Sequence, residues 1–235
     1  MLLEICTNSY QSAINAQEAG AHRIELCSEL SVGGITPSYG LIKRVVEALT
    51  IPVFVLIRPR RGNFYYTSAE FEIIKQDIQI CKDLGCHGIV SGVLNIDNTI
   101  DIKRTKELVE LSKPLSFTFH RAFDCVPNPQ ESLEQLIQLG VERVLTSGQE
   151  SKAIVGLETL KALNLQAKNK IKILVGSGVN SQNAYKFKKA GFDEIHASAS
   201  KVINDESSIY FGNTAQTVSD VDEIKAILKV IQDEV

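Results

Sequence analysis

The stretch Ala19-Gly20-Ala21-His22-Arg23-Ile24-Glu25-Leu26 decides the fold, because in it a helical pattern stops at a glycine and a short apolar strand follows at once. Glycine just past a helix takes the left-handed conformation that lets the chain turn back. The same arrangement recurs three times, with Gly85 before 88–90, Gly140 before 143–145 and Gly191 before 194–196. The recurrence predicts a helix-to-strand unit that repeats along the chain.

Four further β-rich runs lie between these units, at residues 2–6, 53–57, 115–119 and 171–175. Helical patterns separate the expected strands, over 9–19, 38–49, 68–84, 101–112, 129–139, 151–168, 181–190 and 219–232. Strict alternation of strand and helix predicts a parallel sheet with right-handed crossovers, and eight such units suit closure into a barrel. The sequence therefore predicts an α/β fold, a single (β/α)8 TIM barrel domain over residues 1–235. A doubly wound open sheet is the alternative.

The composition is that of an ordinary globular protein, with 44% apolar and 23% charged residues. A formal net charge of −3 gives no electrostatic reason to expect nucleic acid or an anionic membrane as a partner. The first residues lack the basic and long apolar regions of a signal peptide, and the most continuous apolar run, 51–57, is too short to span a bilayer. We expect a cytoplasmic protein. Its five cysteines form no C-x-x-C pair, which argues against a disulfide framework or a zinc ribbon.

The first two strands end in matching residue types, Glu4-Ile5-Cys6 and Glu25-Leu26-Cys27. Side chains alternate along a strand, so the glutamate and the cysteine of each pair share one face, and we expect that face to point into the barrel. Neighbouring strands lie about 4.8 Å apart. The two thiols can therefore approach each other at the mouth of the barrel, where the function of this fold is found.

Polar residues also follow the other strands: Arg58 and Arg60 after the third, His120, Arg121 and Asp124 after the fifth, Ser147 after the sixth, Gly176-Ser177-Gly178 after the seventh, and His196 and Ser198 at the eighth. Burying so many polar groups is costly unless they pair with one another or bind a ligand. The pattern predicts a site. A structural interpretation remains open, in which Glu4 and Glu25 neutralise Arg58 or Arg121. His22 and His87 precede strands and are expected to be structural.

The glycines at 176 and 178 mark a second candidate feature. Barrels of this kind often bind phosphate in the loops after strands seven and eight, where backbone N–H groups face an anion. The Arg58-Pro59-Arg60-Arg61 loop on the opposite side adds positive charge. A short G-x-G also serves tight turns, so both interpretations stay open.

Five segments together resemble one family. The match runs almost end to end, and Thr118-Phe119-His120-Arg121-Ala122-Phe123-Asp124 is its most specific part. The other segments are Arg23-Ile24-Glu25-Leu26-Cys27, Gly33-Gly34-Ile35-Thr36-Pro37-Ser38-Tyr39-Gly40, Ile57-Arg58-Pro59-Arg60 and Leu145-Thr146-Ser147-Gly148. The chain resembles the copper homeostasis protein CutC family.

The resemblance implies a cytoplasmic (β/α)8 barrel that is linked to copper tolerance and forms a homo-oligomer, a dimer or a tetramer. It implies a Cu(I) site at Cys6 and Cys27. Cu(I) is a soft ion that prefers thiolate ligands, so the residue types suit it. No organic cofactor is indicated.

An alternative hypothesis is an enzyme that acts on a small anionic or phosphorylated substrate. Its anion would be bound by Arg58, Arg60, Arg121, Gly176, Ser177, Gly178 and Ser198. His120, Glu25 and Asp124 would supply the acid and base, which requires shifted pKa values. A third hypothesis is a barrel kept for protein contacts. Whether the protein is an enzyme stays open at this point.

Overall fold

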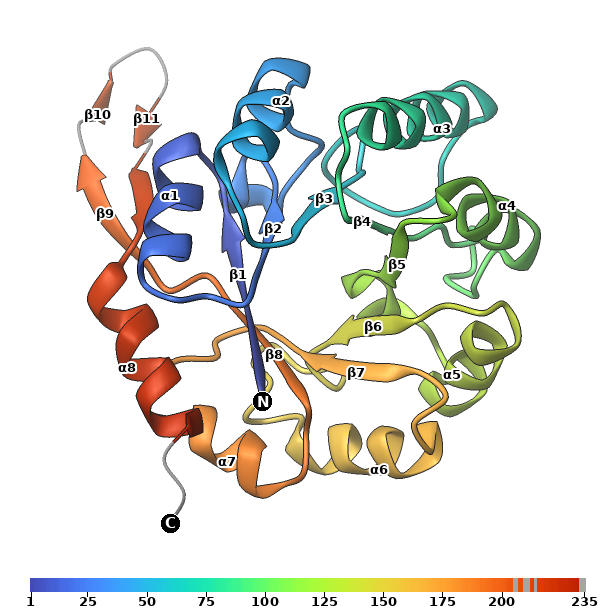
Figure 1. The fold of residues 1–235 in the computed structure, drawn as a ribbon. Helices are drawn as coiled ribbons and strands as arrows, with labels where there is room; N and C mark the ends of the chain where they lie inside the picture. Colours follow the sequence, from blue (N-terminus) through green and yellow to red (C-terminus); the bar gives the residue numbers. More distant parts are fainter. Residues whose placement is uncertain (205–206, 209–211, 214, 233–235) are drawn as a thin grey trace.

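Eight parallel strands close into a barrel in the order β1 to β8, as the alternation of elements predicts (Figure 1). The computed structural model describes residues 1–204, 207–208, 212–213 and 215–232. The barrel strands are β1 Leu2–Thr7, β2 Arg23–Leu26, β3 Val53–Leu56, β4 Gly88–Ser91, β5 Ser116–Phe119, β6 Arg143–Thr146, β7 Lys172–Val175 and β8 Glu194–Ala197. The β1–β8 pairing closes the ring, which excludes the open-sheet alternative.

A helix follows each barrel strand and packs on the outside of the ring (Figure 1). The helices are α1 Tyr10–Glu18, α2 Tyr39–Ala48, α3 Ser68–Asp83, α4 Ile102–Ser112, α5 Pro129–Gln138, α6 Leu157–Ala167, α7 Ala184–Lys189 and α8 Val221–Gln232. Their starts follow local capping chemistry: Thr67 and Glu70 form a capping box at α3, and Asn128 caps α5 with Pro129 in its first turn. None of the described helices is long and apolar enough to cross a membrane.

Helix α6 begins six residues later than the predicted start at 151. The intervening segment folds back over the end of β6, and a Cβ on Gly156 would lie 2.1 Å from the Ser147 carbonyl oxygen. The close backbone contact requires glycine at this point and delays the helix.

The interior and exterior of the sheet carry different side chains. Leu3, Ile5 and Ile24 belong to the large apolar core between the strands and the helices. Cys6, Cys27, Phe54, Leu56 and Val90 form a second, small apolar cluster. Cysteine and glutamate alternate with apolar residues as predicted, which places the cysteines on the inner face.

Four short strands lie outside the barrel and were not predicted. Strand β9 Ser200–Asn204 pairs antiparallel with β12 Gln216–Ser219, and β10 Ser207–Ser208 pairs with β11 Gly212–Asn213. Figure 1 shows them beside α1. Asn15 on α1 donates to the Ser219 carbonyl oxygen at 2.9 Å, so this extension is anchored to the first helix.

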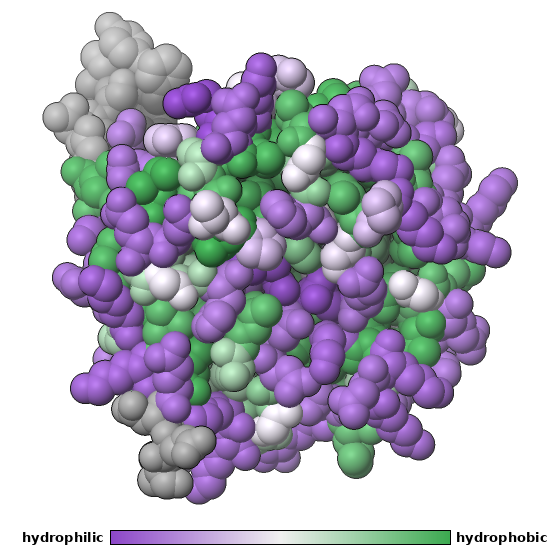
Figure 2. Space-filling view, in the orientation of Figure 1, coloured by the Kyte–Doolittle hydropathy of each residue, from purple (hydrophilic) through white to green (hydrophobic). Residues whose placement is uncertain are grey.

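Hydrophilic side chains predominate on the molecular face in Figure 2, with hydrophobic ones scattered among them. This distribution is ordinary for a globular protein, in which single exposed apolar residues need no special explanation.

Candidate functional site

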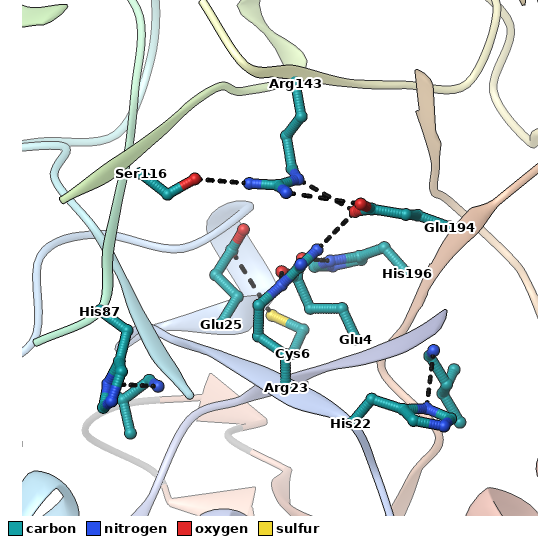
Figure 3. Close-up of polar contacts among 12 residues, drawn as sticks. Glu4, Cys6, His22, Arg23, Glu25, His87, Ser116, Arg143, Glu194 and His196 are labelled. Carbon is teal, nitrogen blue, oxygen red and sulfur yellow. Dashed lines mark hydrogen bonds and ion pairs between the residues drawn. The ribbon is translucent and has the colours of Figure 1, made fainter. Parts of the chain in front are cut away.

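Paired charges fill the barrel interior near the N-terminal ends of the strands, where Arg23, Arg143 and Glu194 begin β2, β6 and β8 (Figure 3). We call this part of the interior the lower layer, and the part nearer the mouth the upper layer. Arg23 forms an ion pair with Glu4 and a second one with Glu194, at 2.8 Å. Arg143 meets the same Glu194 carboxylate at 2.9 Å. Both guanidinium groups lie over the Phe54 ring, at 4.6 Å for Arg23 and 5.3 Å for Arg143. This lower layer is a closed ion-pair network with an aromatic centre.

The prediction that Glu4 neutralises Arg58 or Arg121 is wrong. Glu4 pairs with Arg23 and His196, whereas Arg58 donates to the backbone carbonyls of Val32 and Gly34. The reason is the strand register, which puts Glu4 beside Arg23 on β2. Glu25 forms no ion pair with Arg58 or Arg121 either.

The two predicted thiols lie together above this layer. The Sγ atoms of Cys6 and Cys27 are 3.7 Å apart, and both residues are buried. Cys6 Sγ is also 3.9 Å from Glu25 Oε1. Cys6 and Glu25 are register partners, so Glu25 and Cys27, two positions apart on one face, both flank Cys6.

The loop that follows Cys27 packs closely against this residue at Gly34. Gly34 has a positive φ of 83°, and a Cβ there would lie 2.6 Å from Leu56 Cδ2 and 3.3 Å from Cys27 Cβ. The loop can therefore cover the thiol only with glycine at this position.

His196 completes the group on the other side of Cys6. Its Nδ1 is 2.7 Å from Glu4 Oε1. Ligand atoms of Cys6, Glu25 and His196 lie within 4.8 Å of one another. His196 was noted from the sequence as a strand-end residue but was not assigned to the thiols. The signal that could have done so is barrel closure, which makes β8 the neighbour of β1 and puts His196 opposite Glu4.

The two interior glutamates have opposite pKa shifts. Burial tends to raise the pKa of Glu4, but Arg23 and His196 outweigh it and lower the value to about 2. Burial raises the pKa of Glu25 to about 7, and its buried Oε2 atom has no hydrogen-bond partner among the residues that the structure describes. Glu4 is a charged structural group, whereas Glu25 lies near its titration point at neutral pH.

The thiol and the imidazole are also perturbed. The contact with Cys27, followed by burial, raises the pKa of Cys6 well above its usual value. Burial tends to lower the pKa of His196, but its hydrogen bond to Glu4 and the charges of Glu25 and Glu4 raise it overall.

A cavity of about 240 Å³ opens above these residues. Its lining includes most of the residue types predicted for the barrel mouth. It is lined by Cys6, Glu25, Leu30, Gly33, Leu56, Arg58, Phe64, His120, Arg121, Leu145, Ser177, Gly178, His196 and Ser198. Cys27, Arg60, Asp124 and Gly176 do not belong to this lining.

His120 lines the cavity as a neutral side chain. Burial and the nearby Arg58 guanidinium lower its pKa to about 3. Its Nδ1 accepts the N–H of Ala122 at 3.2 Å, which leaves the proton on Nε2, and Nε2 has no partner among the described residues. A group with this pKa is a poor acid or base at neutral pH.

The arginines predicted to bind an anion are largely occupied by the protein. Arg58 donates to three backbone carbonyls, including that of Gly62 at 2.8 Å. Arg60 forms an ion pair with Glu70. Arg121 forms one with Asp124 at 2.7 Å and donates to Ser147.

Asp124 ties the end of β5 to the end of β6. Its carboxylate accepts from the Thr146 hydroxyl at 2.5 Å and from the backbone N–H groups of Ser147 and Gln149. The Asp124 carboxylate is therefore occupied by protein groups. The other two histidines are structural, as expected: His22 and His87 accept the N–H groups of Leu3 and Val53 at the opposite end of the barrel.

Comparisons with known proteins match this chain to one family. A sequence model of the CutC family matches residues 1–201. The family protein CutC of Histophilus somni is 43% identical over 243 aligned positions, which cover 99% of this chain and 100% of that protein. The human copper homeostasis protein cutC homolog is 47% identical over 199 residues, 84% of this chain and 73% of that one.

A solved structure also matches this chain to CutC. The crystal structure of CutC from Streptococcus agalactiae aligns with a TM-score of 0.81 and 35% identity, over 84% of this chain and 98% of that chain. Residues 1–201, which the family model matches, include every barrel strand and both Cys6 and Cys27. The chain belongs to the CutC family.

Proposed function

We propose that this protein takes part in copper homeostasis by binding one Cu(I) ion between the thiolates of Cys6 and Cys27. The observation that carries the proposal is the 3.7 Å separation of the two sulfur atoms at the barrel mouth. Cu(I) is soft, prefers thiolates and accepts low coordination numbers, so two cysteines suffice. The human relative is named for copper homeostasis, which agrees with this choice.

The surroundings of the thiols suit a soft ion. Cys6 and Cys27 pack in the small apolar cluster with Phe54, Leu56 and Val90. These neighbours keep water from the sulfur atoms on the inner side. Cys6 lines the cavity, so an ion arriving through the mouth would meet this thiol first.

Proton release accompanies binding in this proposal. Metal ligation requires the thiolate form, and the raised pKa of Cys6 means that its proton must leave when the ion binds. The affinity for Cu(I) therefore depends on pH. We also propose a cytoplasmic location, where a reducing environment keeps the thiols free. The dimeric or tetrameric assembly expected from the resemblance remains a prediction.

The enzyme hypothesis is the weaker candidate. Of its proposed acid–base residues, Glu25 has a suitable pKa of about 7, but His120 has a pKa of about 3. Arg58, proposed to bind the anion, already donates to three backbone carbonyls. Arg60 does not line the cavity. Of the predicted anion-binding residues that line the cavity, Arg121 is already paired with Asp124, which leaves Ser177, Gly178 and Ser198.

Anaerobic titration of the reduced protein with Cu(I), against a competing chelator, tests the proposal. The wild-type protein is expected to bind one Cu(I) tightly, and the Cys6→Ser/Cys27→Ser double variant to lose that binding. Cys125→Ser is the matched control, because this cysteine is exposed and does not line the cavity. Equal binding by the double variant and the wild type would overturn the two-thiol site.

A further inference from the structure

We propose that the barrel mouth holds a second metal site, for a divalent cation of the zinc class, formed by Cys6, Glu25 and His196. The site overlaps the two-thiol site at Cys6 but needs two residues that Cu(I) binding does not. The two sites share Cys6, but Cys27 is needed only for Cu(I), and Glu25 and His196 only for the divalent ion, so each proposal can fail without the other.

The first argument is geometric. One ligand atom from each of the three residues lies within 4.8 Å of the other two. Around a tetrahedral ion with metal–ligand distances of about 2.0–2.3 Å, neighbouring ligand atoms stand roughly 3.5 Å apart. Small rotations of the three side chains would bring their ligand atoms from within 4.8 Å of one another to this tetrahedral spacing. The three residues come from β2, β1 and β8, which are adjacent in the closed barrel, so the backbone need not move.

The second argument is the support of the imidazole. His196 Nδ1 lies 2.7 Å from the Glu4 carboxylate, and Glu4 is itself held by Arg23 (Figure 3). In the neutral imidazole, the ionised carboxylate accepts the Nδ1 proton, and Nε2 carries the lone pair that can bind a metal. Histidines that ligate a metal usually donate their other ring N–H to a carboxylate in this way.

The third argument is an unmet need at Glu25. Its Oε2 atom is buried and has no hydrogen-bond partner among the described residues. Buried polar atoms are normally satisfied, and a carboxylate oxygen is costly to leave without a partner. Glu25 lines the cavity, so a bound cation would supply the missing interaction.

The chemistry of the three donors decides the class of ion. One thiolate, one carboxylate and one imidazole form a mixed set that suits Zn²⁺, whereas Cu(I) favours the two sulfur atoms. Three protein ligands leave the fourth position of a tetrahedral ion open. All three residues line the cavity, so that position is accessible to water or a small ligand.

Paired metal titrations of single variants test the proposal. Zn²⁺ binding is measured by competition with a chromophoric chelator. Co²⁺ serves as a spectroscopic probe, because thiolate-to-cobalt charge transfer reports ligation by Cys6. Wild-type protein is expected to bind one Zn²⁺ and to show the thiolate–cobalt band. His196→Gln and Glu25→Gln are each expected to weaken Zn²⁺ binding by roughly tenfold or more while Cu(I) binding persists.

The reverse pattern is expected of Cys27→Ser, which should lose Cu(I) and keep Zn²⁺. His87→Gln is the matched control, because this histidine lies at the opposite end of the barrel. Circular dichroism checks the fold of each variant, and the near-isosteric Glu25→Gln carries the test if His196→Gln fails to fold. Absence of Zn²⁺ binding in the wild type, or binding unchanged in both His196→Gln and Glu25→Gln, would overturn the divalent site. A wild-type protein that binds Zn²⁺ but not Cu(I) would instead overturn the copper proposal and leave the divalent site standing.

Discussion

The two halves of the barrel interior bury charge in different ways. In the lower layer, Arg23 and Arg143 share Glu194, and Glu4 completes the network. In the upper layer, an oxygen of Glu25 and a nitrogen of His120 find no partner in the described part of the chain. Both layers lie inside the same closed sheet, so burial alone does not separate them.

The difference separates structure from function. A buried charge is tolerated when an opposite charge and hydrogen bonds compensate for lost water. The lower layer meets that condition within the protein. In the upper layer, Glu25 Oε2 and His120 Nε2 lack a partner among the described residues, and both side chains line the cavity, where a ligand would supply one. In this barrel, a buried polar atom that lacks a partner among the described residues and belongs to a side chain lining the cavity, as in Glu25 and His120, marks the candidate site better than the mere presence of charged residues does.

The largest effect is expected from breaking the lower layer. Glu194→Ala removes the carboxylate that Arg23 and Arg143 share, and leaves two buried guanidinium groups short of a partner. Loss of one member of a buried pair costs about 3–5 kcal/mol. Urea denaturation of the wild type and the variant measures the change. A loss below about 1 kcal/mol would mean that the network is not the stabilising element of the lower layer.

The next effect concerns Glu25 and the pH dependence of stability. The pKa of Glu25 rises from 4.5 in the unfolded chain to about 7 in the folded protein. Between these values the folded state binds more protons, so its contribution to stability decreases as pH rises from 4.5 to 7, by up to roughly 3 kcal/mol. Glu4, with a pKa of about 2, has the opposite sign: its contribution is present above 4.5 and is lost as pH falls towards 2.

Glu25→Gln separates the two contributions. The variant is expected to become more stable than the wild type as pH rises from 4.5 to 7, measured as the free energy of unfolding at each pH. A difference between the two proteins that stays constant with pH would contradict the assignment of a raised pKa to Glu25.

A smaller effect is expected in the upper layer when pH is varied during copper binding. Each thiol proton released on binding makes the Cu(I) affinity rise by about tenfold per pH unit below the thiol pKa. The raised pKa of Cys6 keeps this slope through neutral pH. Competition titrations at several pH values measure it. An affinity independent of pH would show that the ion does not displace the Cys6 proton.

The smallest effect is expected at the surface, which sharpens the contrast with both interior layers. Glu47 forms an exposed ion pair with Arg44 at 3.5 Å. Exposed pairs contribute about 0–1 kcal/mol. Glu47→Ala should therefore change the midpoint of urea denaturation very little. A cost comparable to that of Glu194→Ala would remove burial as the explanation of the difference.

Much of the fold could be predicted from the sequence, because its signals are local. A glycine after each of four helices marked the repeated unit, and alternation along β1 and β2 turned Cys6 and Cys27 to one face. The strands β9 and β12 could not be found in this way. Val202 and Ile203 in β9 are both exposed, so no alternating pattern of burial marks this segment.

The partners within the site depended on information that is not local. The pairing of Glu4 with Arg23 follows from strand register, and the approach of His196 follows from closure of the ring. Neither is encoded in the spacing of residues along the chain. Residue types at the mouth were predictable, whereas the contacts among them required the three-dimensional arrangement.

The β1–β8 seam also has a consequence for how the protein is made. Glu4 and His196 are 192 positions apart, and they meet only where the first strand joins the last. The cysteines of the mouth leave the ribosome early, whereas their imidazole neighbour is among the last parts of the barrel to be synthesised. A nascent chain therefore carries its thiols long before it can assemble the three-residue cluster, and a chain that stops short of β8 never assembles it.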